Sequence, residues 1–278
     1  MRPAHLAITL FNGPHRSALP MTTLRSAALG PLCTTDAVHK AQATLALDLC
    51  LPVGRTERLS PSAPIPGRPA RPELLAHTLL KPKPLTTVEG RALLVHSVAH
   101  IELNAIDLAL DVVWRFPDLP DAFYTDWMRI AQEEAKHFML LRQHLCRLGY
   151  DYGDFPAHNG LWEMAERTQD DVLARIGIVP RTLEARGLDA SPGVKNKLIG
   201  AGDHEAGQIL DLILEEEIGH VAAGNRWYRH LCEARGLDPV ATYAQLIAQY
   251  DAPKLRPPFN LAARRRAGFD DAELAALG

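Results

Sequence analysis

Two short motifs in this chain combine residues that bind metals. Glu134-Ala135-Lys136-His137 and Glu217-Ile218-Gly219-His220 each place a glutamate three residues before a histidine, within an apolar run of helical periodicity. Side chains at this spacing lie on one face of a helix. Two such pairs, with one glutamate from each of two other helices, are the ligand set of a carboxylate-bridged dinuclear site in a four-helix bundle. A single motif is weak evidence, but two on apolar faces are much harder to obtain by chance.

A further helix is expected to supply Glu102. The capping-box sequence Thr86-Thr87-Val88-Glu89 predicts where this helix begins, and Pro117 predicts that it ends at Phe116. The rest of the Glu102 face is apolar, with Val95, Ala99, Ile106, Ala109 and Val113. A carboxylate on such a stripe costs free energy unless it is paired or binds a metal. The other faces carry polar residues that we expect to be solvated, namely Asn104, Asp107 and Asp111.

The predicted depth of Glu102 in the bundle matches that of Glu134. The turn at 117–120 joins their helices, and each glutamate lies sixteen residues from Asp118. In an antiparallel helical hairpin, equal distance from the turn means equal depth, so both carboxylates reach one level of the core. The adjacent Glu133 is predicted to point away from that level.

The second half of the chain is expected to repeat this arrangement after a long connection. The connector at 150–159 is rich in Gly, Pro and Asp and, when extended, can cross the length of a bundle, on the order of 30 Å. A third helix is predicted from about 160 to 186, kinked at Pro180, and a fourth from about 203 to 234, capped by Asp203. Glycines between 187 and 193 are expected to interrupt the helical pattern.

Glu184 is the best candidate for the last glutamate. Reflecting Glu217 about the turn at 200–202 leads close to it, whereas Glu163 and Glu166 lie too far toward the other end of the bundle. Glu216, four residues before His220, is left open as an alternative to Glu217.

This ligand set favours iron or manganese. Carboxylates and imidazoles without thiolates suit these metals rather than structural zinc. We expect two iron ions, with manganese or a mixed pair as the alternative, Glu134 and Glu217 as bridges, and open positions for dioxygen. The predicted ligands are Glu102, Glu134, His137, Glu184, Glu217 and His220.

The rest of the sequence is typical of an all-α globular protein. Of its 278 residues, 47% are hydrophobic and 23% are charged. Residues 1–84 are predicted to form an N-terminal extension, and residues 85–278 a bundle domain with short C-terminal helices. Within the extension, 1–30 shows no sustained periodicity, a short helix capped by Thr34 or Thr35 extends to about Cys50, and 51–84 is a proline-rich arm.

The C-terminal region is predicted to be mostly irregular after a helix that ends near Tyr250. A final helical turn is expected from Asp270, with Glu273 completing a capping box. The arginines before it could contact phosphates or form a solvated tail: Arg256, Arg264, Arg265 and Arg266.

Charge and cysteine content favour a cytoplasmic protein. The net charge of −3 gives no general attraction to nucleic acid or membranes. No run is long and apolar enough for a convincing membrane span or signal peptide. The four cysteines form no C-x-x-C pair, which favours reduced thiols over a disulfide framework.

Three groups of residues resemble a known family. They are the segment Ala99–Asp111, the sequence Glu184-Ala185-Arg186-Gly187-Leu188-Asp189, and Pro258-Phe259-Asn260 with Ala267-Gly268-Phe269. Together they resemble the bacterial ferritin-like family catalogued as domain of unknown function 455, over roughly residues 65–275. That family is similar to the tRNA-modifying non-haem di-iron hydroxylases that act on a hypermodified adenosine. The resemblance implies a ferritin-like bundle with a long crossover, and it supports Glu184 as a ligand.

The favoured function is a di-iron oxygenase or oxidase, most simply a hydroxylase of a tRNA nucleoside or a small molecule. Its partners would be dioxygen, the organic substrate and a reductase; tRNA, which the net charge does not support, and a second copy of the chain in a homodimer are further candidates. The alternatives are a ferroxidase or peroxide scavenger, and a binding protein with a structural metal. A cavity beside the metals would favour the first, a 24-subunit shell the second, and a closed, saturated site the third.

Overall fold

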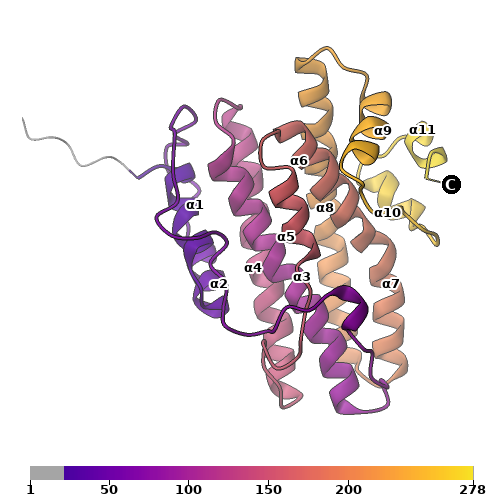
Figure 1. The fold of residues 1–278 in the computed structure, drawn as a ribbon. Coiled ribbons are helices and arrows are strands. Elements are labelled where there is room, and N and C mark those ends of the chain that lie inside the picture. The colour runs from indigo at the N-terminus through magenta and orange to yellow at the C-terminus, as the bar shows by residue number, and fades with distance from the viewer. Residues whose placement is uncertain (1–21, 278) are drawn as a thin grey trace, which may run out of the picture.

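The computed structural model describes residues 22–277, and this part of the chain is mostly helical (Figure 1). It contains no β-strand within 22–277, only an isolated parallel bridge between Leu74 and Ala157. The prediction of an all-α fold is therefore confirmed. The expectation for residues 1–21 lies outside the described residues.

Helices α3 (Val88–Arg115) and α4 (Asp121–Arg147) pack against each other as the predicted hairpin. The predicted capping box is wrong by one residue. Thr87, not Thr86, caps α3, since its hydroxyl accepts a hydrogen bond from the Gly90 N–H. A glycine therefore stands three residues after the cap, and Glu89 pairs with Lys83 instead.

Helix α3 is buried on nearly all sides. Its length and apolar composition would allow it to cross a membrane, but 72% of its apolar window is buried within the molecule, as in the core helix of a soluble protein. The prediction that Asn104, Asp107 and Asp111 are solvated is wrong, because other segments cover those faces. Asp107 pairs with Lys40, and Asp111 pairs with Arg115 and Arg175.

The predicted third helix is divided. The connector after α4 leads into α5 (Gly160–Arg167), and a break at 168–171 precedes α6 (Val172–Ile178). Asp171 begins α6 by accepting a hydrogen bond from the Leu173 N–H. An Asp at an N-cap competes with the backbone of a continuous helix, which accounts for the break.

A π-helical segment, η2 (Val179–Glu184), joins α6 to α7 (Ala185–Gly200) at the predicted Pro180 kink. Proline has no N–H with which to continue the α-helical ladder. The Ala185 N–H donates to the Pro180 carbonyl five residues earlier, so the turn is widened. The predicted interruption at 187–193 is wrong, since α7 is continuous there.

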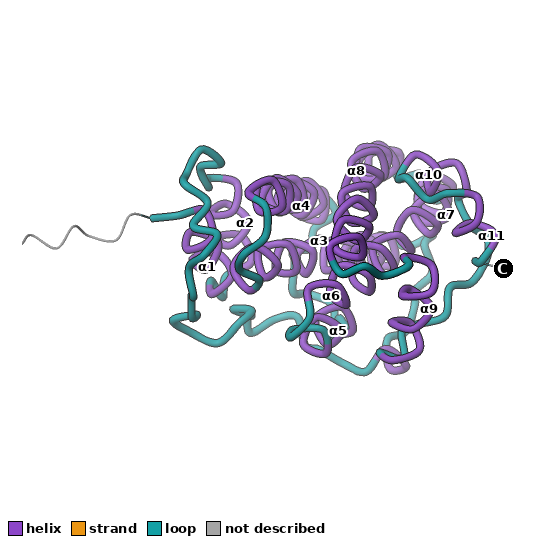
Figure 2. The backbone as a smooth tube through the Cα atoms, turned by 90° about the horizontal axis from the view of Figure 1, so that it is seen from above, coloured by secondary structure: helices purple, strands orange, loops and turns teal. Residues whose placement is uncertain are grey.

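Helix α8 (His204–Ala234) begins at Asp203 as predicted and packs against α4, η2 and α7. Figures 1 and 2 show α3, α4, α7 and α8 as the long central elements, with α5 and α6 beside them. One apolar core extends through these helices.

The N-terminal segment adds two helices to one side of α3 and α4 (Figure 2). Helix α1 (Leu24–Cys33) forms within a region that showed no periodicity, because Thr23 and Ser26 make a reciprocal capping box. Helix α2 (Ala37–Leu45) is shorter than predicted and is capped by Asp36 rather than by a threonine. Both helices contribute to the central core.

The remaining helical elements lie within the proline-rich arm and the C-terminal region. The arm contains only a 3-10 turn, η1 (His77–Leu79). The C-terminal region holds α9 (Pro239–Gln249), α10 (Leu261–Arg266) and α11 (Asp271–Ala275). The Asp270 capping box is confirmed, but the tail before it is not wholly irregular.

Helix α10 carries an arginine whose environment the sequence did not predict. Arg264 is fully buried, pairs with Asp189 of α7 and lies over the rings of Phe259 and Phe269. Arg266 pairs with Glu215 on α8. These arginines hold the C-terminal segment against the central helices.

Candidate metal centre

Four of the six predicted ligands form a buried cluster at the centre of the helices. Glu102 comes from α3, Glu134 and His137 from α4, and Glu217 from α8. One ligand atom of each lies within 4.8 Å of the corresponding atom of every other residue. Such a buried Glu/His group could hold a metal ion.

The other two predicted residues adjoin this cluster. The Nδ1 atom of His220 lies 2.9 Å from Oε1 of Glu134 and 3.5 Å from Oε1 of Glu217. Glu184, at the end of η2, lines the same cavity as Glu102 and Glu217. The structure therefore brings all six residues to one region of the core, and it places Glu217, rather than Glu216, in the cluster.

The widened turn of η2 helps to position Glu184. A π-helical turn re-aims the residues that follow it and is frequent at functional sites. One carboxylate oxygen of Glu184, Oε2, is enclosed and has no hydrogen-bond partner within the described part of the chain. Burial and the charge of Glu217 raise the pKa of Glu184 well above its usual range. An enclosed carboxylate oxygen without a hydrogen-bond partner is suited to bind a cation.

The cluster strongly favours positive charge. Burial and the neighbouring Glu134 raise the pKa of Glu102 to about 7. Burial alone would lower the pKa of His137, but hydrogen bonds with Glu102 and Glu134 outweigh it and raise the value to about 11. The carboxylates thus hold protons on the imidazoles, in places where a metal cation would satisfy the same charges.

Two glutamates whose role the sequence did not predict, Glu133 and Glu216, hold the outer nitrogens of the histidines. Nε2 of His137 lies 2.7 Å from Oε2 of Glu216 on α8, and Nε2 of His220 lies 2.7 Å from Oε2 of Glu133 on α4. Each helix therefore supplies the outer carboxylate for the histidine of the other. The prediction that Glu133 points away from the site is wrong, because the facing helix brings His220 within its reach.

A signal for this arrangement is present in the sequence. Each motif is preceded by a second glutamate, in Glu133-Glu134 and in Glu216-Glu217. A carboxylate on the outer nitrogen fixes the ring orientation and raises its basicity as a ligand. The hydrogen bond from His220 holds the pKa of Glu133 below its usual range, so this glutamate stays ionised.

A cavity of about 300 Å³ lies beside the cluster, between α3, α7 and α8. Two carboxylates of the cluster, those of Glu102 and Glu217, and the adjoining carboxylate of Glu184 form part of its wall. Most other lining residues are apolar, among them Val98, Ile101, Leu161, Leu183, Leu210 and Ile213. Its size lies at the lower end of the range for small-molecule sites, about 300–1,000 Å³.

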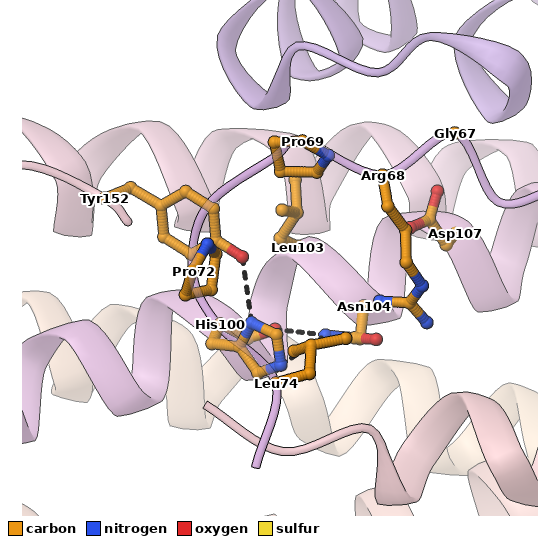
Figure 3. A pocket seen from close by; sticks show the side chains of 10 residues that line it. All are labelled: Gly67, Arg68, Pro69, Pro72, Leu74, His100, Leu103, Asn104, Asp107 and Tyr152. Atoms are coloured by element: carbon orange, nitrogen blue, oxygen red, sulfur yellow. Dashed lines mark hydrogen bonds between the residues drawn. The ribbon is translucent and has the colours of Figure 1, made fainter. Parts of the chain in front are cut away.

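A second, much smaller cavity lies under the proline-rich arm, on another face of α3 (Figure 3). Its volume of about 20 Å³ has room for roughly one water molecule and for no substrate. His100 lines it and bonds through Nδ1 to the Tyr152 hydroxyl at 2.8 Å and through Nε2 to the His158 carbonyl at 2.9 Å. The nearby His96 is buried, and its Nε2 accepts a hydrogen bond from the Gly153 N–H. These histidines hold the connector, as expected for core residues rather than ligands.

Comparison with known proteins identifies the family of the chain. Residues 33–275 match the model of the family described as protein of unknown function DUF455. An uncharacterised protein of Haemophilus influenzae is 45% identical over 221 residues, which are 77% of this chain and 77% of that protein. No solved structure gives a significant match. The predicted resemblance to this family is confirmed, and the chain belongs to the DUF455 family.

Proposed function

We propose that this protein is a ferritin-like, non-haem di-iron oxidoreductase that uses dioxygen to hydroxylate an organic substrate. The main support for this proposal is a buried group of six residues beside an apolar cavity, namely Glu102, Glu134, His137, Glu184, Glu217 and His220. The long helices α3, α4, α7 and α8 would be the four helices of the bundle, and the connector after α4 its long crossover.

The charges of this residue set suit two divalent cations. Four carboxylates and two neutral imidazoles carry four negative charges, which two such ions would balance. The enclosed oxygen of Glu184 would gain a partner. Oxygen and imidazole ligands without thiolate suit iron first and manganese as the alternative.

The protein's own residues have three tasks in this proposal. Glu133 and Glu216 hold the outer nitrogens of the histidines and so direct each Nδ1 toward the cluster. The apolar cavity wall excludes water and holds a C–H bond beside the carboxylates. The metals, when bound, would supply the redox chemistry that activates dioxygen.

The overall reaction requires an external reductant. One oxygen atom of dioxygen is inserted into a C–H bond and the other leaves as water, with two electrons and two protons supplied by a reductase partner. The adjoining cavity favours this reaction over a ferroxidase, a peroxide scavenger or a structural metal site, none of which needs space for an organic molecule. We place the reaction in the cytoplasm, and the relation to tRNA-modifying hydroxylases is part of the proposal.

The first test is the metal content of protein purified from its native host. We expect two transition-metal ions per chain, mainly iron, and an absorption spectrum that changes when the reduced protein meets dioxygen. Glu134→Ala removes a carboxylate at the centre of the cluster and should abolish binding of the pair. Glu215→Ala, at an exposed position paired with Arg266, is the matched control and should keep both ions. Wild-type protein with no bound transition metal would refute the proposal.

A further inference from the structure

A third hollow, distinct from the two cavities described above, lies on the surface beside the cavity of the metal centre. It is a groove of about 950 Å³, bounded by the η1 turn of the arm, the first half of α3, the connector after α4, and α7. Its volume lies within the range for ligand sites. The proline-rich arm forms one wall, and hydrogen bonds fix its position: Leu75 N–H donates to Ala157 O, and Ala157 N–H to Glu73 O.

The groove and the cavity are neighbours. His158 and Val194 line both of them. His158 is held by its carbonyl, which bonds to His100, and its ring meets that of His77 edge-on with 5.8 Å between centroids. A molecule that extended from the groove into the cavity would pass these two residues.

The groove presents unpaired positive charge. Lys81 and Lys197 line it, and neither makes an ion pair within residues 22–277. Of its two acidic residues, Glu89 pairs with Lys83 and Asp154 accepts a hydrogen bond from the Asp151 N–H. Three lysines and two carboxylates therefore line the groove, and its net charge is positive. At the junction, burial and the charge of His77 lower the pKa of His158, and the charge of Glu163 opposes them.

The path inward from these lysines is apolar. Leu79, in the groove, has 60% of its surface exposed to solvent. Leu93 and Leu94 continue the groove, and Val98, Leu161 and Ile213 continue the surface into the cavity. Large exposed apolar side chains beside polar ones mark ligand-binding grooves.

We propose that the groove and cavity form one site for an amphipathic anion. Its carboxylate or phosphate end lies against Lys81 and Lys197, and its apolar chain extends past His158 and Val194 to the carboxylate cluster. That this ligand is the molecule to be oxidised rests on the proposed function. The binding itself does not, since the lysines and apolar side chains that line the groove require no metal.

The test is calorimetry on the metal-free, full-length protein with three eight-carbon probes: octanoate, octyl phosphate and 1-octanol. Both anions should bind at least about tenfold more tightly than the alcohol. The double variant Lys81→Glu/Lys197→Glu should lose about tenfold or more in affinity for the anions, because two attractions become repulsions. Lys254→Glu, at an exposed position outside the groove, is the matched control and should bind like wild type. The stronger of the two anions identifies the head group.

Val194→Trp tests the path into the cavity. The indole should narrow the junction and lower the affinity for octanoate by about tenfold. The affinity for butyrate, whose shorter chain ends in the groove, should not change. Circular dichroism checks that each variant is folded. Equal affinity for octanol and octanoate, or an equal loss in Lys254→Glu, would overturn the proposal. Displacement of octanoate by bulk tRNA would assign the groove to nucleic acid and also overturn it.

Metal content separates this inference from the proposed function. A protein that holds two metals but binds no octanoate retains its proposed redox centre and loses the proposed substrate class. A protein that binds octanoate at the groove but no metal retains the binding site and loses the oxidation.

Discussion

Each histidine of the site contacts carboxylates from more than one helix. His137 contacts Glu102 and Glu134 through Nδ1 and Glu216 through Nε2. A carboxylate hydrogen-bonded to the outer nitrogen fixes the orientation of an imidazole before a metal binds. The outer glutamates should therefore matter for affinity even though they do not touch the ion.

Glu133→Ala and Glu216→Ala should each weaken iron binding by about 10- to 100-fold without abolishing it. Their histidines would keep the Nδ1 contact and lose the partner that orients the ring. Competition with a chelator measures the change. Glu215→Ala lies in the same run of three glutamates but outside the cluster, and an equal loss in this variant would show that the effect is only one of surface charge.

His96 should make the protein less stable in mild acid. Burial and the charge of His100 lower the pKa of His96 from 6.5 to about 4. In the unfolded chain the His96 imidazole is therefore protonated below about pH 6.5, whereas in the folded protein it is protonated only below about pH 4. The stability this residue contributes is complete above pH 6.5 and is lost as the pH falls to 4, by at most about 3 kcal/mol.

Urea unfolding of the metal-free protein between pH 7.5 and 4 would measure this loss. His96→Gln, whose amide oxygen can still accept the Gly153 hydrogen bond, should flatten the pH dependence. His204→Gln, at an exposed position, should leave the slope as in wild type. An unchanged slope in His96→Gln would contradict the assignment.

At the residue scale, the sequence was sufficient to predict that these six residues lie close together, but it did not predict the carboxylates on the outer nitrogens of the histidines. Periodicity predicts which side chains share one helix face, and the equal depths of Glu102 and Glu134 follow from counting along a hairpin. The role of Glu133 depends on how closely α4 and α8 approach. That distance depends on how the two helices pack, and it brings together Glu133 and His220, which are 87 residues apart in sequence.

At the scale of elements, the π-helical segment η2 lies in close contact with α8. A Cβ atom at Gly224 of α8 would come within 2.9 Å of Cβ of Pro180. The widened turn that carries Glu184 is thus pressed against α8 at a point where only glycine fits. The sequence predicted the disturbance at Pro180, but not that it would be a π-helical turn, since this depends on the contact with α8.

Gly224→Ala should destabilise the metal-free protein by about 1–3 kcal/mol, since the methyl group forces α8 and η2 apart. Gly219→Ala is the matched control. It lies in the same helix with no atom within 4 Å of the new Cβ, so it should gain about 0.5–1 kcal/mol from helix propensity. Thermal unfolding measures both. A stabilised Gly224→Ala variant would show that the contact can relax.

Across the whole molecule, buried charges tie the outer segments to the central helices. Lys40 of α2 pairs with Asp107 of α3 and donates to the Gly67 carbonyl of the arm at 2.8 Å. Arg181 of η2 pairs with Glu273 of α11, 92 residues away. Sequence patterns predicted the helices but not these ties, because a charged residue gives no sign of a partner so distant along the chain.

Lys40→Ala should destabilise the protein by about 3–5 kcal/mol, because it leaves the buried carboxylate of Asp107 without its partner. The double variant Lys40→Met/Asp107→Leu should recover most of this loss, since it removes both charges and keeps the volume. Urea denaturation compares them. Lys254→Met, at an exposed position, should change stability by less than about 0.5 kcal/mol. A double variant no better than Lys40→Ala would show that packing, not charge, decides the loss.

The exchange of outer glutamates between α4 and α8 also has a consequence for the order of assembly. The α3–α4 hairpin and the α7–α8 pair can each form through contacts near in sequence, yet neither then holds a fully oriented histidine. The proposed metal centre would therefore be complete only after the two halves have docked. A nascent or partly unfolded chain would therefore bind iron weakly, and the proposed redox centre would form only in the fully folded protein.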